Sequence, residues 1–453
     1  MSRIGISAIF MVLMPGLLWA HASDPGFVLL LPTDVYIVAG GVSVALTVAI
    51  LAVLPDTVAR GVFRPVALAR GRACPAHWTS LVATVILLWL VWRGLAGTRD
   101  PMANPLVLSV WVVFWIALVS LQGLLGDLWR FINPWTGLAA MIGRISGRRA
   151  PLRYPRTLGH WPGVLSFLAF AGFLLADPAP TDPARLAVAV GGYWAITMTA
   201  VLLFGAPWLL RADGITLLMR IYARVGIFGR ARGHLALGLP GWRSLTAPVP
   251  PLGLAILMLL LLGSGSFDGF NETFLWIGLL GHNPLEFPGR SAVVWPNLTG
   301  LLAAQGALIA VFAGCLLLGD RLAGGRVALR VLVCRYAPTI LPIALAYHVA
   351  HYLTSFLLDG QYVLAWLAEA VGAGQIHVSA GFLATPGIVH AIWMTQAGVV
   401  VAGHVIAIIL AHAIAIRAGH GARHAAFSQA PLAVFMVAYT VFGLWLLAAP
   451  RGA

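Results

Sequence analysis

Ten apolar stretches follow one another along the chain, and they constrain its fold more than any other feature. Each is close to the length of about 20 residues that a helix needs to cross the hydrocarbon core of a bilayer. The composition agrees, because 60% of the 453 residues are hydrophobic and only 9% are charged. We therefore expect an all-α polytopic bundle, since a helix satisfies its own backbone hydrogen bonds in lipid. The expected spans are residues 34–54, 79–97, 105–128, 163–177, 184–208, 249–266, 297–318, 338–358, 389–415 and 431–449.

The basic residues are all arginines, and they give a formal net charge of +14. They gather after every second span, in the loops 55–78, 141–161, 211–247, 319–337 and 417–430, while the alternate loops carry most of the acidic residues. Basic loops stay on the cytoplasmic side of a membrane, so this pattern predicts that both termini lie outside. We expect a protein of the bacterial inner membrane whose environment is the lipid bilayer, with no nucleic-acid partner.

The first 22 residues have the features of a secretory signal peptide. Arg3 is followed by an apolar run and then by the small-residue pattern Ala20-His21-Ala22. Residues 23–453 would then form the ten-span domain, with long outer loops at 266–296 and 359–389. An uncleaved first span is the alternative. Cleavage after Ala20 would instead leave His21 at the N-terminus, where its amine and imidazole could chelate copper.

Histidines inside the spans 338–358 and 389–415 are the main candidates for a functional site. Ionisable groups within lipid-spanning segments are costly and mark functional sites. His348 and His351 share one helix face, and His348 and His404 both lie near the middle of their spans. We expect these three imidazoles to hold zinc or copper, with His390 nearer the outer face and an open position for water. Hydrogen bonding between helices is the alternative role.

Two further polar residues are candidates for catalysis. Asp268 lies in the polar run 264–272 at the outer end of the sixth span, where it could supply a carboxylate or position a water molecule. Gln396 lies in the histidine-bearing ninth span. A solvated helix cap is the alternative for the run around Asp268. A b-type heme is a weaker possibility, because His390 and His404 are 14 residues apart (404 − 390) but the partner span has no similar pair.

A third polar group lies at the inner end of the third span. Asp127 and Arg130 are three residues apart, so on one helix they would form an ion pair. Asn133 and Pro134 would then end that helix, because the residue before a proline disfavours helical backbone angles.

Several of these motifs, in the same order, resemble a bacterial family of polytopic membrane proteins that carries the name fenitrothion hydrolase. They are residues 126–135 (GDLWRFINPW), 266–270 (SFDGF), 347–352 (YHVAHY), and the run from Trp393 through Gln396 and His404 to His412. The resemblance implies an inner-membrane hydrolase of organophosphorus triesters, which are lipophilic small molecules. A metal-bound water would attack phosphorus in such an enzyme. The alternative is a copper, other metal or heme transporter, or an assembly factor for a respiratory complex.

Overall fold

The computed structural model describes residues 31–53, 61–70, 76–147, 150–287, 289–418 and 422–450. Within these ranges nine helical segments are long and apolar enough to cross a membrane, and the apolar helix α8 (Trp161–Ala176) is shorter. The chain is thus an all-α polytopic bundle and a multi-pass membrane protein, as expected. The signal-peptide segment and His21 lie outside the described residues.

The nine crossing segments and the shorter α8 together match the ten expected spans in number and order. The crossing segments are α1 (Thr33–Val53), α3 (His77–Ala96), the continuous run α4–η2–α5 (Pro105–Leu125), α9 (Pro183–Phe204), α13 (Leu252–Asn271), α15 (Val294–Leu322), α17 (Leu341–Ala370), α18 (Pro386–Arg417) and α19 (Ala422–Ala448). Within the third of these, η2 (Leu108–Leu118) is π-helical. Shorter elements join them: α6 (Trp129–Ile132), α7 (Thr136–Ser146), α10 (Ala206–Arg211), α11 (Gly214–Tyr222), α12 (Trp242–Thr246), α14 (Phe274–Leu279) and α16 (Leu329–Tyr336).

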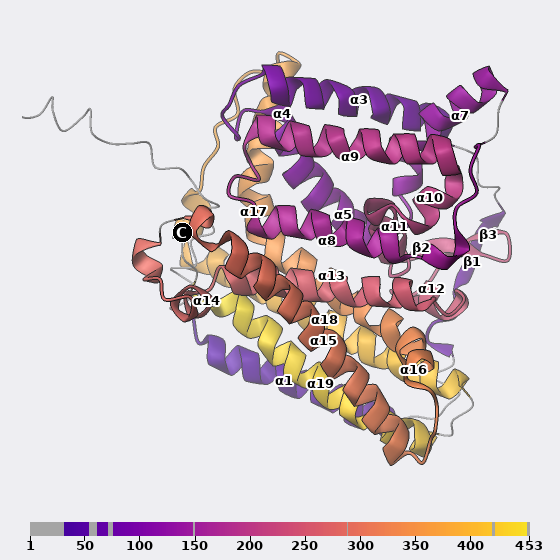
Figure 1. Ribbon diagram of the computed structural model, residues 1–453. Helices are drawn as coiled ribbons and strands as arrows, with labels where there is room; N and C mark the ends of the chain where they lie inside the picture. The colour runs from indigo at the N-terminus through magenta and orange to yellow at the C-terminus, as the bar shows by residue number, and fades with distance from the viewer. Residues whose placement is uncertain are drawn as a thin grey trace, which may run out of the picture.

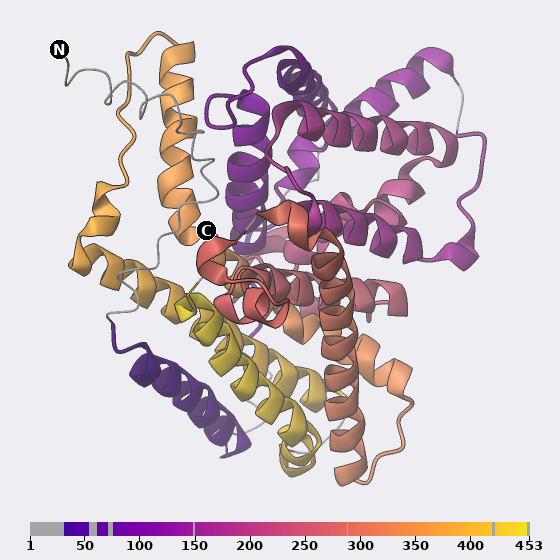
Figure 2. The same cartoon turned by 60° about the vertical axis from the view of Figure 1, so that its left-hand side comes forward.

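Helix α13 occupies the middle of the bundle (Figure 1). It packs against α8, α15 and α17, and its residues 257–264 are all buried. A helix that is apolar on every side is expected in an interior position. In Figure 1, α3, α9 and α8 lie on one side of α13, and α15, α19 and α1 lie on the other. Figure 2 shows α1, α18 and α19 side by side, in agreement with their contacts.

The basic loops meet at one end of the bundle, which we call the arginine-rich end. A three-stranded antiparallel sheet there has the order β1-β3-β2, formed by β1 (Val66–Arg70), β2 (Phe228–Ala231) and β3 (His234–Leu237). It joins the first basic loop to the third. Arg417 Nη1 also donates to the carbonyl oxygen of Leu245 (2.7 Å), which ties the end of α18 to α12.

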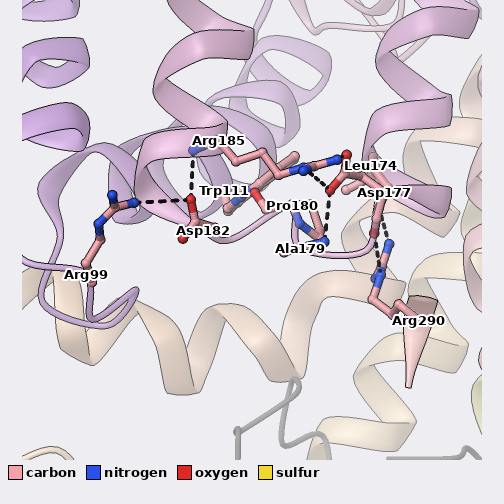
Figure 3. A network of polar contacts seen from close by, with 9 residues as sticks. All are labelled: Arg99, Trp111, Leu174, Asp177, Ala179, Pro180, Asp182, Arg185 and Arg290. Atoms are coloured by element: carbon pink, nitrogen blue, oxygen red, sulfur yellow. Dashed lines mark hydrogen bonds and ion pairs between the residues drawn. The ribbon is translucent and has the colours of Figure 1, made fainter. Parts of the chain in front are cut away.

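The opposite end is held by ion pairs between short loops (Figure 3). Arg185 contacts Asp177 (2.7 Å), and Arg99 contacts Asp182 (3.5 Å). Arg290 donates to the carbonyl oxygens of Asp177 (3.1 Å) and Leu174 (2.6 Å). These bonds fix the α8–α9 turn against the chain that enters α15.

The structure shortens the two outer loops that the sequence predicts. Helix α13 continues to Asn271, so the polar run 264–271 is helical and Asp268 is buried instead of forming a solvated cap. Helix α17 continues to Ala370, which removes the first part of the expected loop 359–389. Buried polar residues lower the apparent hydropathy of a helix without ending it, which is why the sequence placed both helix ends too early.

The expected ion pair between Asp127 and Arg130 is wrong for the described chain. Helix α5 ends at Leu125, and Gly126 has a φ of 137°, so the two residues do not share a continuous helix. Asp127 instead accepts a hydrogen bond from Gln122 Nε2 (3.4 Å), and Arg130 lies over the ring of Phe131 (4.4 Å). The next helix does end at Ile132, directly before Asn133 and Pro134.

Candidate functional site: a carboxylate–imidazole pair between α13 and α17

Two glycines of α13 allow α17 to approach it closely. A Cβ at Gly265 would lie 3.5 Å from the Tyr347 ring, and a Cβ at Gly269 would overlap the Tyr347 hydroxyl. Small residues at helix crossings in membrane proteins bring the backbones together in this way. The close crossing places Asp268 of α13 opposite His351 and Tyr352 of α17.

The Asp268 carboxylate has two partners on α17. Its Oδ2 lies 3.3 Å from His351 Nε2 and also accepts a hydrogen bond from the Tyr352 hydroxyl. Both Asp268 and His351 are 8% exposed, so this contact is shielded from solvent. A buried carboxylate needs such partners, because leaving it without a cation or hydrogen-bond donors is costly.

The contact also defines the roles of the two His351 nitrogens. A carboxylate oxygen accepts, so Nε2 carries the shared proton. His351 Nδ1 is buried and has no hydrogen-bond partner among the described residues. The His351 ring stacks on Tyr347, with ring centroids 5.6 Å apart and planes at 14°. His351 is therefore a positioned imidazole whose second nitrogen can accept a proton or contact a ligand.

His348 lies one turn earlier on the same helix and is held differently. Its Nε2 donates to the carbonyl oxygen of Trp115 (3.0 Å) in the π-helical segment η2. Its ring also meets Trp115 and Tyr352 edge-on, at centroid distances of 5.1 and 5.0 Å. Since Nε2 is used in this bond, only His348 Nδ1 could take part in further chemistry.

A small internal cavity lies beside this pair. Its volume is ≈ 20 Å³, measured as the space open to the centre of a water-sized sphere. Its polar lining includes Ser264, Asp268, Tyr347, His348, His351 and Tyr352. A polar cavity needs about 10–15 Å³ in this measure to hold one water molecule, so the site has room for one.

His404 belongs to a different polar contact. Its Nδ1 donates to the carbonyl oxygen of Val400 one turn earlier on α18 (2.9 Å), and its ring lies 6.5 Å from that of Tyr439 on α19. Tyr439 in turn bonds Ser266 of α13 (2.6 Å). His404 does not line the cavity, but its Nε2 is buried without a hydrogen-bond partner in the described chain.

Gln396 and His390 are also separate from the pair. Gln396 Nε2 donates to the carbonyl oxygen of Ala350 (2.8 Å), so it joins α18 to α17. His390 is exposed and lies 3.5 Å from the Tyr36 hydroxyl of α1. Within the described ranges, no group of three His, Cys, Asp or Glu residues is placed to hold a metal ion. The expected convergence of His348, His351 and His404 is thus not found, because each ring is turned toward a different partner.

Three residues of these networks were not among the predicted site residues: Tyr352, Trp115 and Tyr439. Tyr352 follows His351 directly, in the motif at residues 347–352, so the sequence did contain a signal for it. Trp115 accepts the hydrogen bond from His348 through its backbone carbonyl oxygen, and no pattern of side chains in the sequence predicts such a backbone contact.

Comparison of the chain with protein-family models, with curated proteins and with solved structures finds no match.

Proposed function

We propose that the chain is a proton-coupled membrane transporter in which Asp268 and His351 carry the coupling proton. The observation that supports this most is the buried contact between the Asp268 carboxylate and the His351 imidazole (3.3 Å) at the crossing of two membrane helices. Intramembrane carboxylates and imidazoles that pair with each other are typical of proton relays and ion pathways. The arginine pattern supports an inner-membrane orientation with the arginine-rich end in the cytoplasm.

The pair can exchange a proton without moving the backbone far. His351 Nδ1 accepts a proton from a hydronium ion that reaches the adjoining cavity, which leaves a neutral water molecule, and the resulting imidazolium stays beside the Asp268 carboxylate. Tyr352 holds the same carboxylate oxygen throughout. Release of the proton toward the other side of the membrane returns the neutral imidazole, so the proton is transferred and none is consumed.

A metal cation is the cargo that we propose for this transporter. His351 Nδ1 is buried beside the cavity and has no hydrogen-bond partner among the described residues. Neutral imidazole nitrogens suit zinc and copper. A cation that binds beside Asp268 would displace the proton through charge repulsion, so cation and proton would move in opposite directions.

Hydrolysis of organophosphorus triesters is the second candidate function. It is favoured by the Asp268-oriented His351 beside room for one water molecule, which is the arrangement of a general base and its nucleophile. The resemblance to the fenitrothion hydrolase family supports the same chemistry. A triester is far larger than the cavity, so α13 and α17 would have to separate to admit it from the bilayer.

One set of proteoliposomes tests both functions. The vesicles contain the full-length protein, an acidic interior and an indicator for the ion that is added outside, which is either zinc or copper(I). We expect wild-type protein to accelerate uptake of one of these ions under the pH gradient. Asp268→Asn should reduce uptake to the level of empty vesicles. The matched control is His377→Gln, which removes an exposed loop imidazole and should leave uptake unchanged.

Release of nitrophenolate from an aryl phosphotriester is measured on the same vesicles. Turnover that disappears in His351→Gln, without transport of either ion, would replace the transporter by the hydrolase. Wild-type vesicles that neither transport an ion nor release nitrophenolate would contradict both functions.

A further inference from the structure

Three arginines converge at the arginine-rich end of the bundle. Arg220 belongs to α11, Arg224 lies on the turn after it, and Arg243 belongs to α12. Arg220 and Arg224 flank the end of α11, and Arg220 lies close enough to repel the Arg224 guanidinium. Arg243 Nη1 donates to the carbonyl oxygen of Ala223 (2.7 Å), so its side chain lies against the same turn. Gly229 of β2 leaves room for it, since a Cβ there would stand 3.0 Å from Arg243 Nε.

The positive charge of this group is not balanced by the described chain. Arg224 Nη1 is buried and has no hydrogen-bond partner there. No carboxylate of the described residues lies within ion-pair distance of Arg220, Arg224 or Arg243. Burial lowers the pKa of Arg220 and of Arg243, and the negative charge of Asp127, which opposes this shift, lies on an exposed side chain. A buried cation without a partner is strongly unfavourable, so an anion is needed at this position.

The protonation energetics agree with this geometry. Burial, followed by repulsion from Arg220 and Arg243, lowers the pKa of the Arg224 guanidinium to about 10. Burial and then Arg211, Arg220 and Arg224 lower the pKa of His160. The neighbouring groups therefore experience an excess of positive charge around Arg224.

The arginines at the other end of the bundle provide an internal comparison. Arg99 and Arg185 each contact a carboxylate, and Arg290 donates to two backbone carbonyl oxygens (Figure 3). The chain thus supplies partners for arginines where they serve only to hold loops together. Arg220 and Arg243 likewise donate to backbone carbonyl oxygens, those of Leu210 (3.2 Å) and Ala223 (2.7 Å). Arg224 differs, because its half-buried side chain has an Nη1 without a hydrogen-bond partner in the described chain.

We propose that Arg220, Arg224 and Arg243 bind a phosphate-bearing anion, either the headgroup of an anionic phospholipid or inorganic phosphate. Guanidinium groups match phosphate oxygens with paired hydrogen bonds, which is why arginine is used where phosphate is recognised. Basic pockets between helices at the cytoplasmic side of membrane proteins bind lipid headgroups by the same chemistry. The bound anion accepts the hydrogen bond for which Arg224 Nη1 has no acceptor in the described chain, and it joins α11, α12 and the sheet.

The test is the thermal unfolding of the full-length protein in a neutral detergent, with two separate additions. Sodium phosphate is compared with sodium chloride at equal ionic strength, and phosphatidylglycerol is compared with phosphatidylcholine. A rise in the unfolding midpoint with phosphate identifies the free anion. A rise with phosphatidylglycerol alone identifies the lipid headgroup. We expect Arg224→Gln to weaken the apparent affinity by about tenfold, as loss of a charged hydrogen-bond group does, whereas the exposed control Arg153→Gln should keep the wild-type response.

The anion-free proteins provide the control for folding. Without anion, Arg224→Gln should unfold at or above the wild-type midpoint, because it removes an unpaired buried charge. If that variant does not fold, Arg243→Gln is titrated in its place and decides the question. The proposal is overturned if neither anion raises the wild-type midpoint, or if the variant tested keeps the full response.

Discussion

At the scale of single residues, Asp268 shows how a carboxylate is accommodated inside a membrane bundle. Its Oδ2 receives the Tyr352 hydroxyl and faces His351 Nε2, and both partners come from one turn of α17. The pair exists only because Gly265 and Gly269 let that helix approach α13. The close packing of α13 against α17 therefore determines the contact between Asp268 and His351, and a substitution that changes the packing should also change this contact.

Gly269→Ala tests that connection. The added methyl group would overlap the Tyr347 hydroxyl, so the Tyr347 side chain, which stacks on His351, must shift or α13 and α17 must separate, and either change disturbs the contact between Asp268 and His351. We expect a loss of about 1–3 kcal/mol in stability, typical of overpacking, together with loss of transport. Gly306→Ala in α15 is the matched control, because a Cβ there meets nothing within 4 Å. Thermal unfolding in detergent measures both, and equal midpoints for the two variants would contradict this account of the crossing.

The sequence identified Asp268, His348 and His351 as candidates but could not pair them. Tyr352 and Asp268 are 84 residues apart, so their contact depends on where two helices cross, which hydropathy does not encode. His404 shows what the depth of a residue in its span leaves undetermined. Its depth in the span predicted a shared metal site, yet its ring bonds its own helix at Val400. The depth of a residue in the membrane follows from its position within the span, whereas the direction of its ring depends on tertiary packing.

At the scale of elements, the order and approximate position of every crossing helix were predictable, and the helix ends were not. Apolar runs predict the spans, because a segment that crosses the hydrocarbon core must satisfy its own backbone hydrogen bonds as a helix and expose apolar side chains to lipid. Helix α13 passes the expected end by five residues (271 − 266), since its polar residues are buried against other helices instead of solvated. The small sheet was also missed. Every residue of β1 is exposed, so the strand has no apolar alternation that would reveal it.

At the scale of the whole molecule, the two ends of the bundle differ in charge and in how they are held. One end gathers the arginine-rich loops around the sheet, and the other closes with ion pairs and with the bond from Phe274 N to the carbonyl oxygen of Pro450 (3.0 Å). Tyr36 near the start of α1 meets Trp393 near the start of α18, with ring centroids 5.2 Å apart, so the chain begins its first crossing at this second end.

This asymmetry predicts the orientation in the membrane. In a cysteine-free variant, Pro180→Cys in the α8–α9 turn should react with an impermeant thiol reagent in intact cells. Arg153→Cys in a basic loop should react only after the cells are opened, because arginine-rich loops remain in the cytoplasm. The same two variants, labelled before and after permeabilisation, serve as each other's control. The reverse pattern would place the arginine-rich end outside.

The central claim is that the pair of Asp268 and His351 takes up and releases a proton inside the membrane, and that in the protonated pair a proton is shared between His351 Nε2 and Asp268 Oδ2. The most direct measurement uses a hydrophobic carbodiimide, which reacts with a carboxyl group only in its protonated form, followed by peptide mass spectrometry of the membrane-embedded protein. The account predicts that Asp268 is modified, that its modification increases as the pH is lowered, and that bound zinc or copper(I) suppresses it. An Asp268 that stays unmodified at every pH where the protein remains folded, in membranes where carbodiimide modifies other carboxyl groups, would contradict the claim.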